Sequence, residues 1–177
     1  MSDHPASDPP SAFISEWVRR VSGSGGRALD VATGRGRHAR LLASAGFRTF
    51  GVDSDHQSVA AATSAGAADG LTIRGWCADL TSHPLPREWF DLVVVVRYLQ
   101  RDLWPALARA LTPGGLLLYE TFTEAQRAKG RGPTSPHHLL RPGELREQFP
   151  GLEVEFYEET LEPDALARLA ARKPVNR

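Results

Sequence analysis

The sequence predicts an α/β fold: a doubly wound, mostly parallel sheet with helices on both faces, within a single domain. Two observations predict it. Short apolar runs alternate along the chain with segments whose apolar residues recur at helical spacing, which is the pattern of strands and their covering helices. The run at 90–96 also ends in four consecutive valines, as in a central parallel strand that is buried on both faces.

Length, charge and cysteine content restrict the class of protein. The chain has 177 residues, the size of one domain, and 21 basic and 21 acidic side chains give a net charge of zero. A neutral chain disfavours nucleic acid as a partner. The single cysteine, Cys77, excludes an intramolecular disulfide, and we expect it to be buried in a strand. Since no apolar run is long enough for a membrane span and the first residues lack the features of a signal peptide, we expect a cytoplasmic protein without membrane contact.

The N-terminal half contains three expected strands. Polar, proline-rich residues 1–10 predict a disordered tail. A helix is expected over 11–22, with Phe13 and Trp17 on its apolar face. Strands are expected at 28–32, 48–52 and 71–78, and helices at 37–45 and 56–65. Gly66 is expected to close the last of these helices.

The C-terminal half continues the alternation and then becomes irregular. After the strand at 90–96, a helix capped by Asp102 is expected to run to Leu111, followed by a turn and a strand at 116–121. Residues 123–141 are polar and broken by glycine and proline, which is typical of a lid or binding loop. A helix at 142–149 and a strand at 152–157 follow. The alanines and arginines of the last segment, 165–173, favour a helix.

A glycine-containing turn joins the first strand to the helix that follows it. Gly34 and Gly36 permit backbone angles closed to other residues, and the helix that begins at Arg37 presents unpaired N–H groups to an anionic ligand. Gly34-x-Gly36-x-x-Ala39 fits the dinucleotide-binding fingerprint, and Asp53 ends the next apolar run nineteen residues later, where a ribose-binding acid belongs. These residues alone fit a nicotinamide-dependent enzyme equally well.

Two further acids and a second motif favour another class of enzyme over a nicotinamide-dependent one. Asp30 precedes the glycines at the end of the first strand, and Asp79 follows the third strand. The phrase Leu111-Thr112-Pro113-Gly114-Gly115 then precedes an apolar strand. With these features, the chain from 13 to 174 resembles the class I S-adenosylmethionine-dependent methyltransferases, and most of all their small bacterial tellurite-resistance-type subgroup.

The resemblance implies a Rossmann-like sheet of seven strands in one domain over 11–177. Its parts would be a lid helix at 11–22, a core at 27–122, a lid or substrate loop at 123–141, and a C-terminal helix with strands at 142–173. In the family an antiparallel strand closes the sheet, so we expect a strand at 165–173 in spite of its helix-favouring composition. The implied cofactor is S-adenosylmethionine, and the implied product is S-adenosylhomocysteine.

The same resemblance assigns the cofactor-binding residues. The glycine turn would hold the methionine end, Asp53 the ribose hydroxyls, and Asp79 with the Leu80 backbone N–H the adenine. A helix cap is the alternative role for Asp53, and a plain surface carboxylate is the alternative for Asp79. The full set expected to contact the cofactor is Asp30, Thr33, Gly34, Arg35, Gly36, Arg37, Asp53, Ser54, Asp79, Leu80 and Arg97.

The end of the fourth strand departs from the family pattern. Relatives carry Asn-Tyr-Leu-His-Arg where this chain has Arg97-Tyr98-Leu99-Gln100-Arg101. Arg97 cannot act as a base because guanidinium stays protonated, but it can bind a carboxylate or another anionic group. Tyr98 can line the sulfonium site, although both residues could also serve only to close the strand. The expected acceptor contacts are Phe13, Trp17, Arg97 and Tyr98, and core packing is the alternative role for the first two.

No residue stands out as a general base. The candidates for moving a proton are Tyr98, Glu120, His137 and His138. The adjacent histidines lack a third ligand nearby, so we expect no metal site.

Methyl transfer from a sulfonium is a direct displacement that mainly requires alignment of the reactants and exclusion of water. We expect a small-molecule or metalloid acceptor. A protein or RNA acceptor is the first alternative, disfavoured by short loops and zero net charge. A non-catalytic S-adenosylmethionine-binding module is the second, and a nicotinamide-dependent oxidoreductase, for which no Tyr-x-x-x-Lys pair is present, is the third. The sequence leaves the acceptor's identity open, and monomer and homodimer remain alternatives.

Overall fold

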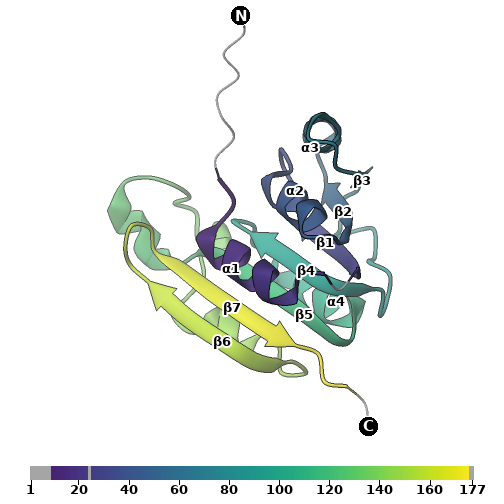
Figure 1. The fold of residues 1–177 in the computed structure, drawn as a ribbon. Coiled ribbons are helices and arrows are strands. Elements are labelled where there is room, and N and C mark those ends of the chain that lie inside the picture. Colours follow the sequence, from purple (N-terminus) through teal and green to yellow (C-terminus); the bar gives the residue numbers. More distant parts are fainter. Residues whose placement is uncertain (1–8, 24, 176–177) are drawn as a thin grey trace, which may run out of the picture.

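A seven-stranded sheet forms the centre of the computed structural model, which describes residues 9–23 and 25–175 (Figure 1). The strand order is β3-β2-β1-β4-β5-β7-β6; β1 to β5 run parallel, and β7 is antiparallel to both of its neighbours. The strands are β1 (Arg27–Val31), β2 (Arg48–Asp53), β3 (Ile73–Cys77), β4 (Phe90–Val96), β5 (Leu111–Phe122), β6 (Glu153–Thr160) and β7 (Leu166–Arg172). The predicted fold class is confirmed. Most of the tail expected at 1–10 lies outside the described residues.

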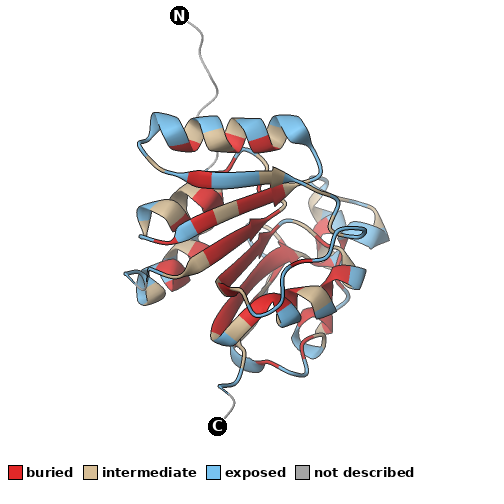
Figure 2. Cartoon of the chain, turned by 90° about the vertical axis from the view of Figure 1, so that its right-hand side faces the viewer, coloured by how far each residue is buried: buried red, intermediate tan, exposed pale blue. Residues whose placement is uncertain are grey.

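Helices cover both faces of this sheet, as predicted. On one face, α1 and α2 pack over β1, β4 and β5, and α3 lies beside α2 against β2 and β3. On the other face, α4 and α5 cover the second apolar cluster. The helices are α1 (Ala12–Val21), α2 (Arg37–Ser44), α3 (His56–Ala68), α4 (Trp104–Ala110) and α5 (Glu144–Glu147), with 3₁₀ turns η1 (Arg101–Leu103), η2 (Glu124–Lys129) and η3 (Pro136–His138). Figure 2 shows the middle strands almost entirely buried between the two layers.

The segment at 166–172 forms a strand, in agreement with the prediction drawn from the family. Its alanines alone favour a helix, but β7 pairs with β5 on one side and β6 on the other, and five of its seven residues are buried. Its side chains contribute to both apolar clusters, so the strand is covered on both faces. Tertiary packing therefore overrides local propensity here.

Several local predictions were wrong. Helix α3 runs past Gly66 to Ala68, because Gly66 packs against β3 inside the helix: a Cβ there would lie 2.7 Å from Ile73 Cδ1. Cys77 is exposed, since β3 is an edge strand. Asp102 makes no capping hydrogen bond, because it lies in the 3₁₀ turn before α4. The helix expected at 142–149 is reduced to one turn, α5.

The irregular segment after β5 is attached to the turn between β6 and β7. The Gln126 side chain is buried; its amide donates to the Arg131 carbonyl (3.2 Å) and to Asp164 Oδ1 (3.1 Å), and its oxygen accepts from the Ala165 N–H (2.7 Å). Lys129 reaches Glu162 in the same turn. These bonds hold the segment beside the carboxyl ends of the central strands.

Candidate functional site

The turn after β1 reverses the chain within five residues. Ala32, Gly34 and Gly36 all adopt positive φ angles (54°, 52° and 79°). The Thr33 N–H donates to the Val52 carbonyl (3.0 Å), and the Gly36 N–H donates back to the Thr33 carbonyl (2.9 Å). The turn is thereby fixed to β2 and delivers the chain to the first residue of α2.

Asp30 lies beneath this turn and holds it. Its Oδ2 accepts from the Thr33 hydroxyl (2.7 Å) and from the Ala39 N–H (3.1 Å). The side chain is buried, and this burial raises the pKa of Asp30 to about 7, from an ordinary value of 3.8. Asp30 therefore connects β1, the turn and the first residues of α2.

His38 connects α2 to α1, a contact that the sequence reasoning did not identify. Its Nε2 accepts from the Ser11 N–H (3.0 Å) at the start of α1, so this nitrogen carries no proton. Burial, reinforced by the charges of Arg37 and Arg97, lowers the pKa of His38 to about 3. The only sequence signal was the position of His38 in the apolar stripe of α2.

Asp53 is held at the end of β2 by two backbone donors. The Gly34 N–H donates to its Oδ2 (2.9 Å) and the Asp55 N–H to its Oδ1 (3.0 Å). A carboxylate offers about four acceptor positions, so two are left for ligand hydroxyls. The helix-cap role belongs to Asp55 instead, whose side chain accepts from the Gln57 and Ser58 N–H groups.

A cleft of about 400 Å³ opens at the carboxyl ends of β1 to β4. It brings together Asp53 and Asp79, predicted from the ends of two different strands, with Leu80 and Tyr98. Its described lining is Val31, Ala32, Val52, Asp53, Ser54, Ala78, Asp79, Leu80, Thr81, Tyr98 and Gln100. The position fits the rule that open α/β sheets bind ligands at the carboxyl ends of their strands.

Asp79 is fixed by the turn that follows β3. Its Oδ1 accepts from the Thr81 hydroxyl (2.7 Å) and from the Thr81 N–H (2.9 Å). The hydroxyl bond, then the backbone bond, lowers the pKa of Asp79, so the exposed carboxylate stays ionised at neutral pH. Thr81 was not predicted; a threonine two residues after an aspartate is a weak signal for such a turn.

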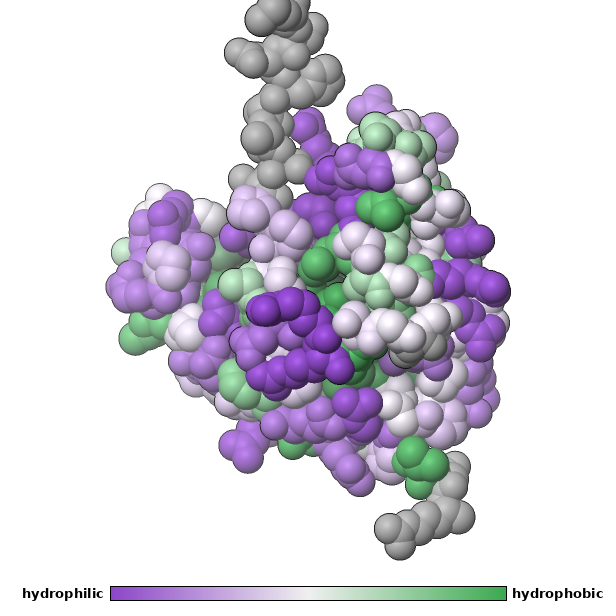
Figure 3. All heavy atoms as spheres, in the orientation of Figure 1, coloured by the Kyte–Doolittle hydropathy of each residue, from purple (hydrophilic) through white to green (hydrophobic). Residues whose placement is uncertain are grey.

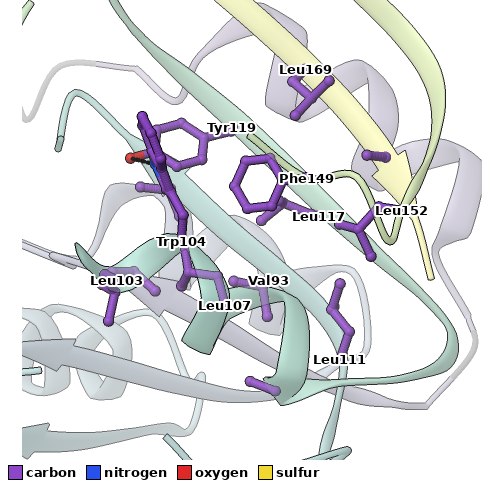
Figure 4. Packing of buried hydrophobic residues seen from close by; sticks show 14 of the residues in the cluster. Val93, Leu103, Trp104, Leu107, Leu111, Leu117, Tyr119, Phe149, Leu152 and Leu169 are labelled. Atoms are coloured by element: carbon purple, nitrogen blue, oxygen red, sulfur yellow. Dashed lines mark hydrogen bonds between the residues drawn. The ribbon is translucent and has the colours of Figure 1, made fainter. Parts of the chain in front are cut away.

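Tyr98 borders the cleft and is half-buried. Burial raises the pKa of its hydroxyl, and the charges of Asp79 and Asp53 add to this effect. The hydroxyl is thus a donor rather than a base at neutral pH. The Tyr98 carbonyl accepts from the buried Tyr119 hydroxyl (2.8 Å), which Trp104 also contacts (Figure 4). The core cluster thereby fixes the loop after β4.

The other candidates for proton transfer lie outside the cleft lining. Glu120 is buried in an ion pair with Arg168 (2.6 Å), which also binds Glu158 (2.8 Å). His137 and His138 are exposed in η3, where His137 borders a separate pocket of about 200 Å³. Among the described residues, no group of three His, Cys, Asp or Glu side chains could hold a metal ion.

Four further predicted residues lie outside the lining of the cleft. Phe13 and Trp17 are buried and pack on Phe156, with ring centroids 5.7 and 6.2 Å away, so they belong to the core. This packing favours the alternative role stated for them, and acceptor contact stays a prediction. Arg35 is exposed on the turn, and the Arg37 guanidinium reaches the Pro9 carbonyl (3.4 Å).

A model of the methyltransferase domain family matches residues 28–115, which include the turn, Asp53 and Asp79. The chain belongs to the S-adenosylmethionine-dependent methyltransferases. Its cofactor is S-adenosylmethionine. A search of curated proteins finds no match. Among the described residues, no helix of this methyltransferase is long and apolar enough to cross a membrane.

Solved structures share its class I fold at low sequence identity. A methyltransferase from Mesorhizobium loti is 22% identical, with a TM-score of 0.70 over 90% of this chain and 98% of that one. TehB from Haemophilus influenzae is 18% identical, with a TM-score of 0.73 over 90% of this chain and 61% of its own. The [4+2]-cyclase SpnF is 19% identical, with a TM-score of 0.76 over 92% of this chain and 80% of that one. These likenesses concern the fold alone.

Replacement of the two turn glycines by alanine is expected to lower the stability of the protein by different amounts. A Cβ on Gly34 meets nothing within 4 Å, whereas a Cβ on Gly36 would lie 2.7 Å from Ala62 Cβ. Both positions have positive φ, which costs alanine about 1 kcal/mol. Gly34→Ala should therefore lower the free energy of unfolding by about that amount, and Gly36→Ala by at least ~2 kcal/mol, since α2 and α3 must separate. Urea unfolding measures both; equal losses would contradict the close approach of Gly36 to α3.

Proposed function

We propose that this methyltransferase transfers a methyl group to a small-molecule acceptor by direct displacement. The observation that carries the proposal is the cleft at the strand ends, where Asp53 and Asp79 are both held by neighbouring donors with acceptor positions left over. The residues present fit the cofactor: a ribose requires two acceptors, and Gly34 leaves open space above its backbone.

In the proposed complex, residues at the ends of three strands bind different parts of the cofactor. Asp53 accepts from both ribose hydroxyls, with Ser54 beside it; Asp79 accepts from the adenine amino group, and the Leu80 N–H donates to the ring. The turn from Thr33 to Arg37 holds the methionine end, above Asp30. When bound, the cofactor supplies a methyl group on a positively charged sulfur. The protein aligns the acceptor and excludes water.

The acceptor would approach past the loop after β4 and the segment at 123–141, which we propose as a substrate loop. A small acceptor is supported by the zero net charge and by the resemblance of the sequence to the small tellurite-resistance-type subgroup. On the same analogy, we propose a place near that subgroup, with a metalloid acceptor as one possibility. Gln100 lines the cleft where relatives carry a histidine, which favours a non-catalytic binding module as the second candidate.

Transfer of a labelled methyl group tests these candidates. The protein is incubated with S-adenosylmethionine carrying a tritiated methyl group and with a cell extract separated into small molecules, protein and RNA. We expect label in the small-molecule fraction. Label in protein or RNA would contradict a small acceptor. Calorimetric binding of S-adenosylhomocysteine, but not NADH, without transfer to any fraction would favour the non-catalytic module.

A further inference from the structure

Arg97 is held in a strained position at the end of the central strand β4. Its φ angle is 54°, the left-handed region that side chains other than glycine rarely adopt. Its N–H donates to the Glu120 carbonyl of β5 (2.8 Å), so the sheet itself imposes this conformation. Strained residues of this kind are concentrated at functional sites.

The Arg97 side chain lies outside the cofactor cleft, although the next residue lines it. Its guanidinium carbon is 5.6 Å from the centre of the Phe122 ring, at the end of β5. Its charge also lowers the pKa values of His38 and Asp164, though in neither case as the leading cause. The guanidinium therefore lies near the end of β5, within electrostatic reach of α2 and of the turn before β7, and the following residue, Tyr98, lines the cleft.

Arg97 differs from three other arginines of the C-terminal half in having no carboxylate partner. Among the described residues, no hydrogen bond or ion pair involves its guanidinium, whereas Arg101, Arg131 and Arg168 each pair with a carboxylate. Asp164, the acid within its electrostatic reach, already binds Arg131 (2.9 Å) and the Gln126 amide (3.1 Å). The N–H groups of the Arg97 guanidinium, which lies over the Phe122 ring, are thus available to an anionic ligand.

Solvent reaches Arg97 and part of the neighbouring Phe122 side chain. On the face drawn in Figure 3, hydrophilic residues predominate over the lobe formed by the segment after β5. Arg97 itself is exposed. A planar guanidinium binds a carboxylate through two parallel hydrogen bonds, and the partly exposed Phe122 side chain offers apolar contact to the body of the same molecule.

We infer that the acceptor is a carboxylate with an apolar body, whose charged group binds Arg97 and whose body packs on Phe122. This inference rests on the proposed function, because it assigns the acceptor of that same reaction. Arg97 then acts as a specificity residue: it selects an anionic acceptor and places it beside the cleft.

Benzoate and its uncharged analogue benzamide test the inference by NMR titration of ¹⁵N-labelled protein, with and without S-adenosylhomocysteine. The Arg97 Nε–H resonance is identified by its absence from Arg97→Lys. We expect benzoate to shift this resonance and to bind at least about tenfold more tightly than benzamide. Arg97→Gln should abolish this preference while S-adenosylhomocysteine affinity stays within about twofold. Arg97→Lys, which keeps the charge, should retain part of the preference.

Arg74 provides the matched control. It is exposed and its guanidinium carbon lies 5.8 Å from the centre of the Phe50 ring, but on the edge strand β3, three strands away from β4. Arg74→Gln should leave benzoate binding unchanged. Equal binding of benzoate and benzamide, or an equal loss in Arg74→Gln, would overturn the inference. Absence of S-adenosylhomocysteine binding to the wild-type protein would instead overturn the proposed function, so the two failures are distinguishable.

Discussion

Asp53→Ala is expected to lower the affinity for S-adenosylhomocysteine by at least tenfold. Two hydrogen bonds from ribose hydroxyls to a charged group contribute about 1.5–3 kcal/mol each, and about 1.4 kcal/mol corresponds to a factor of ten. The substitution also removes the acceptor of the Gly34 N–H, which holds the glycine turn against β2. Isothermal titration calorimetry measures the affinity.

Asp55→Ala is the control for this experiment. Asp55 is the neighbouring acid and caps α3, so its loss should cost about 1 kcal/mol of stability. Its side chain is outside the described cleft lining, and we expect its removal to leave the affinity unchanged. An unaltered affinity in Asp53→Ala, or an equal loss in Asp55→Ala, would contradict the ribose assignment.

The stabilities of Asp30→Asn and His38→Gln are expected to depend on pH in opposite directions. The pKa of Asp30 is about 7 in the folded protein and 3.8 ordinarily, so between these values the folded state binds the extra proton and stability falls as pH rises. The pKa of His38 is about 3 folded and 6.5 ordinarily, so between these values the unfolded state binds the extra proton and stability rises with pH. In the wild type the two effects oppose each other between pH 3.8 and 6.5.

Each variant removes one of these two opposing effects of pH on stability. Relative to the wild type, Asp30→Asn should gain stability with rising pH by about 1.4 kcal/mol per pH unit, and His38→Gln should lose it at a similar rate. Asparagine keeps an oxygen for Thr33 and Ala39, and glutamine keeps one for Ser11, so both variants should fold. Urea unfolding at several pH values between 4 and 6.5 gives the slopes. If the stability of both variants changed with pH in parallel with the wild type, burial would not shift the pKa values of Asp30 and His38.

The acids of the candidate site could be located from sequence because parallel strands place their carboxyl ends at one edge. Asp53 and Asp79 each follow an apolar run, so the fold brings them to one cleft. The contacts that orient them were harder to predict. The Gly34 N–H reaches Asp53 across nineteen residues, and only the closed turn places that donor.

Other contacts depend on tertiary pairing that local patterns do not encode. Glu120 was a candidate base, but its partner Arg168 is 48 residues away and on the strand whose existence composition argued against. Phe13 and Trp17 have the spacing of a helix face, which does not state whether that face meets a ligand or the core. Phe156 on β6 packs against both rings, which favours the core, and no local pattern indicates that partner.

A crystal structure with S-adenosylhomocysteine tests the central claim most directly. The account predicts electron density for the nucleoside in the cleft at the ends of β1 to β4, with both ribose hydroxyls within hydrogen-bond distance of the Asp53 carboxylate and the adenine amino group facing Asp79. A nucleoside bound elsewhere, or with its ribose hydroxyls directed away from Asp53, would contradict it.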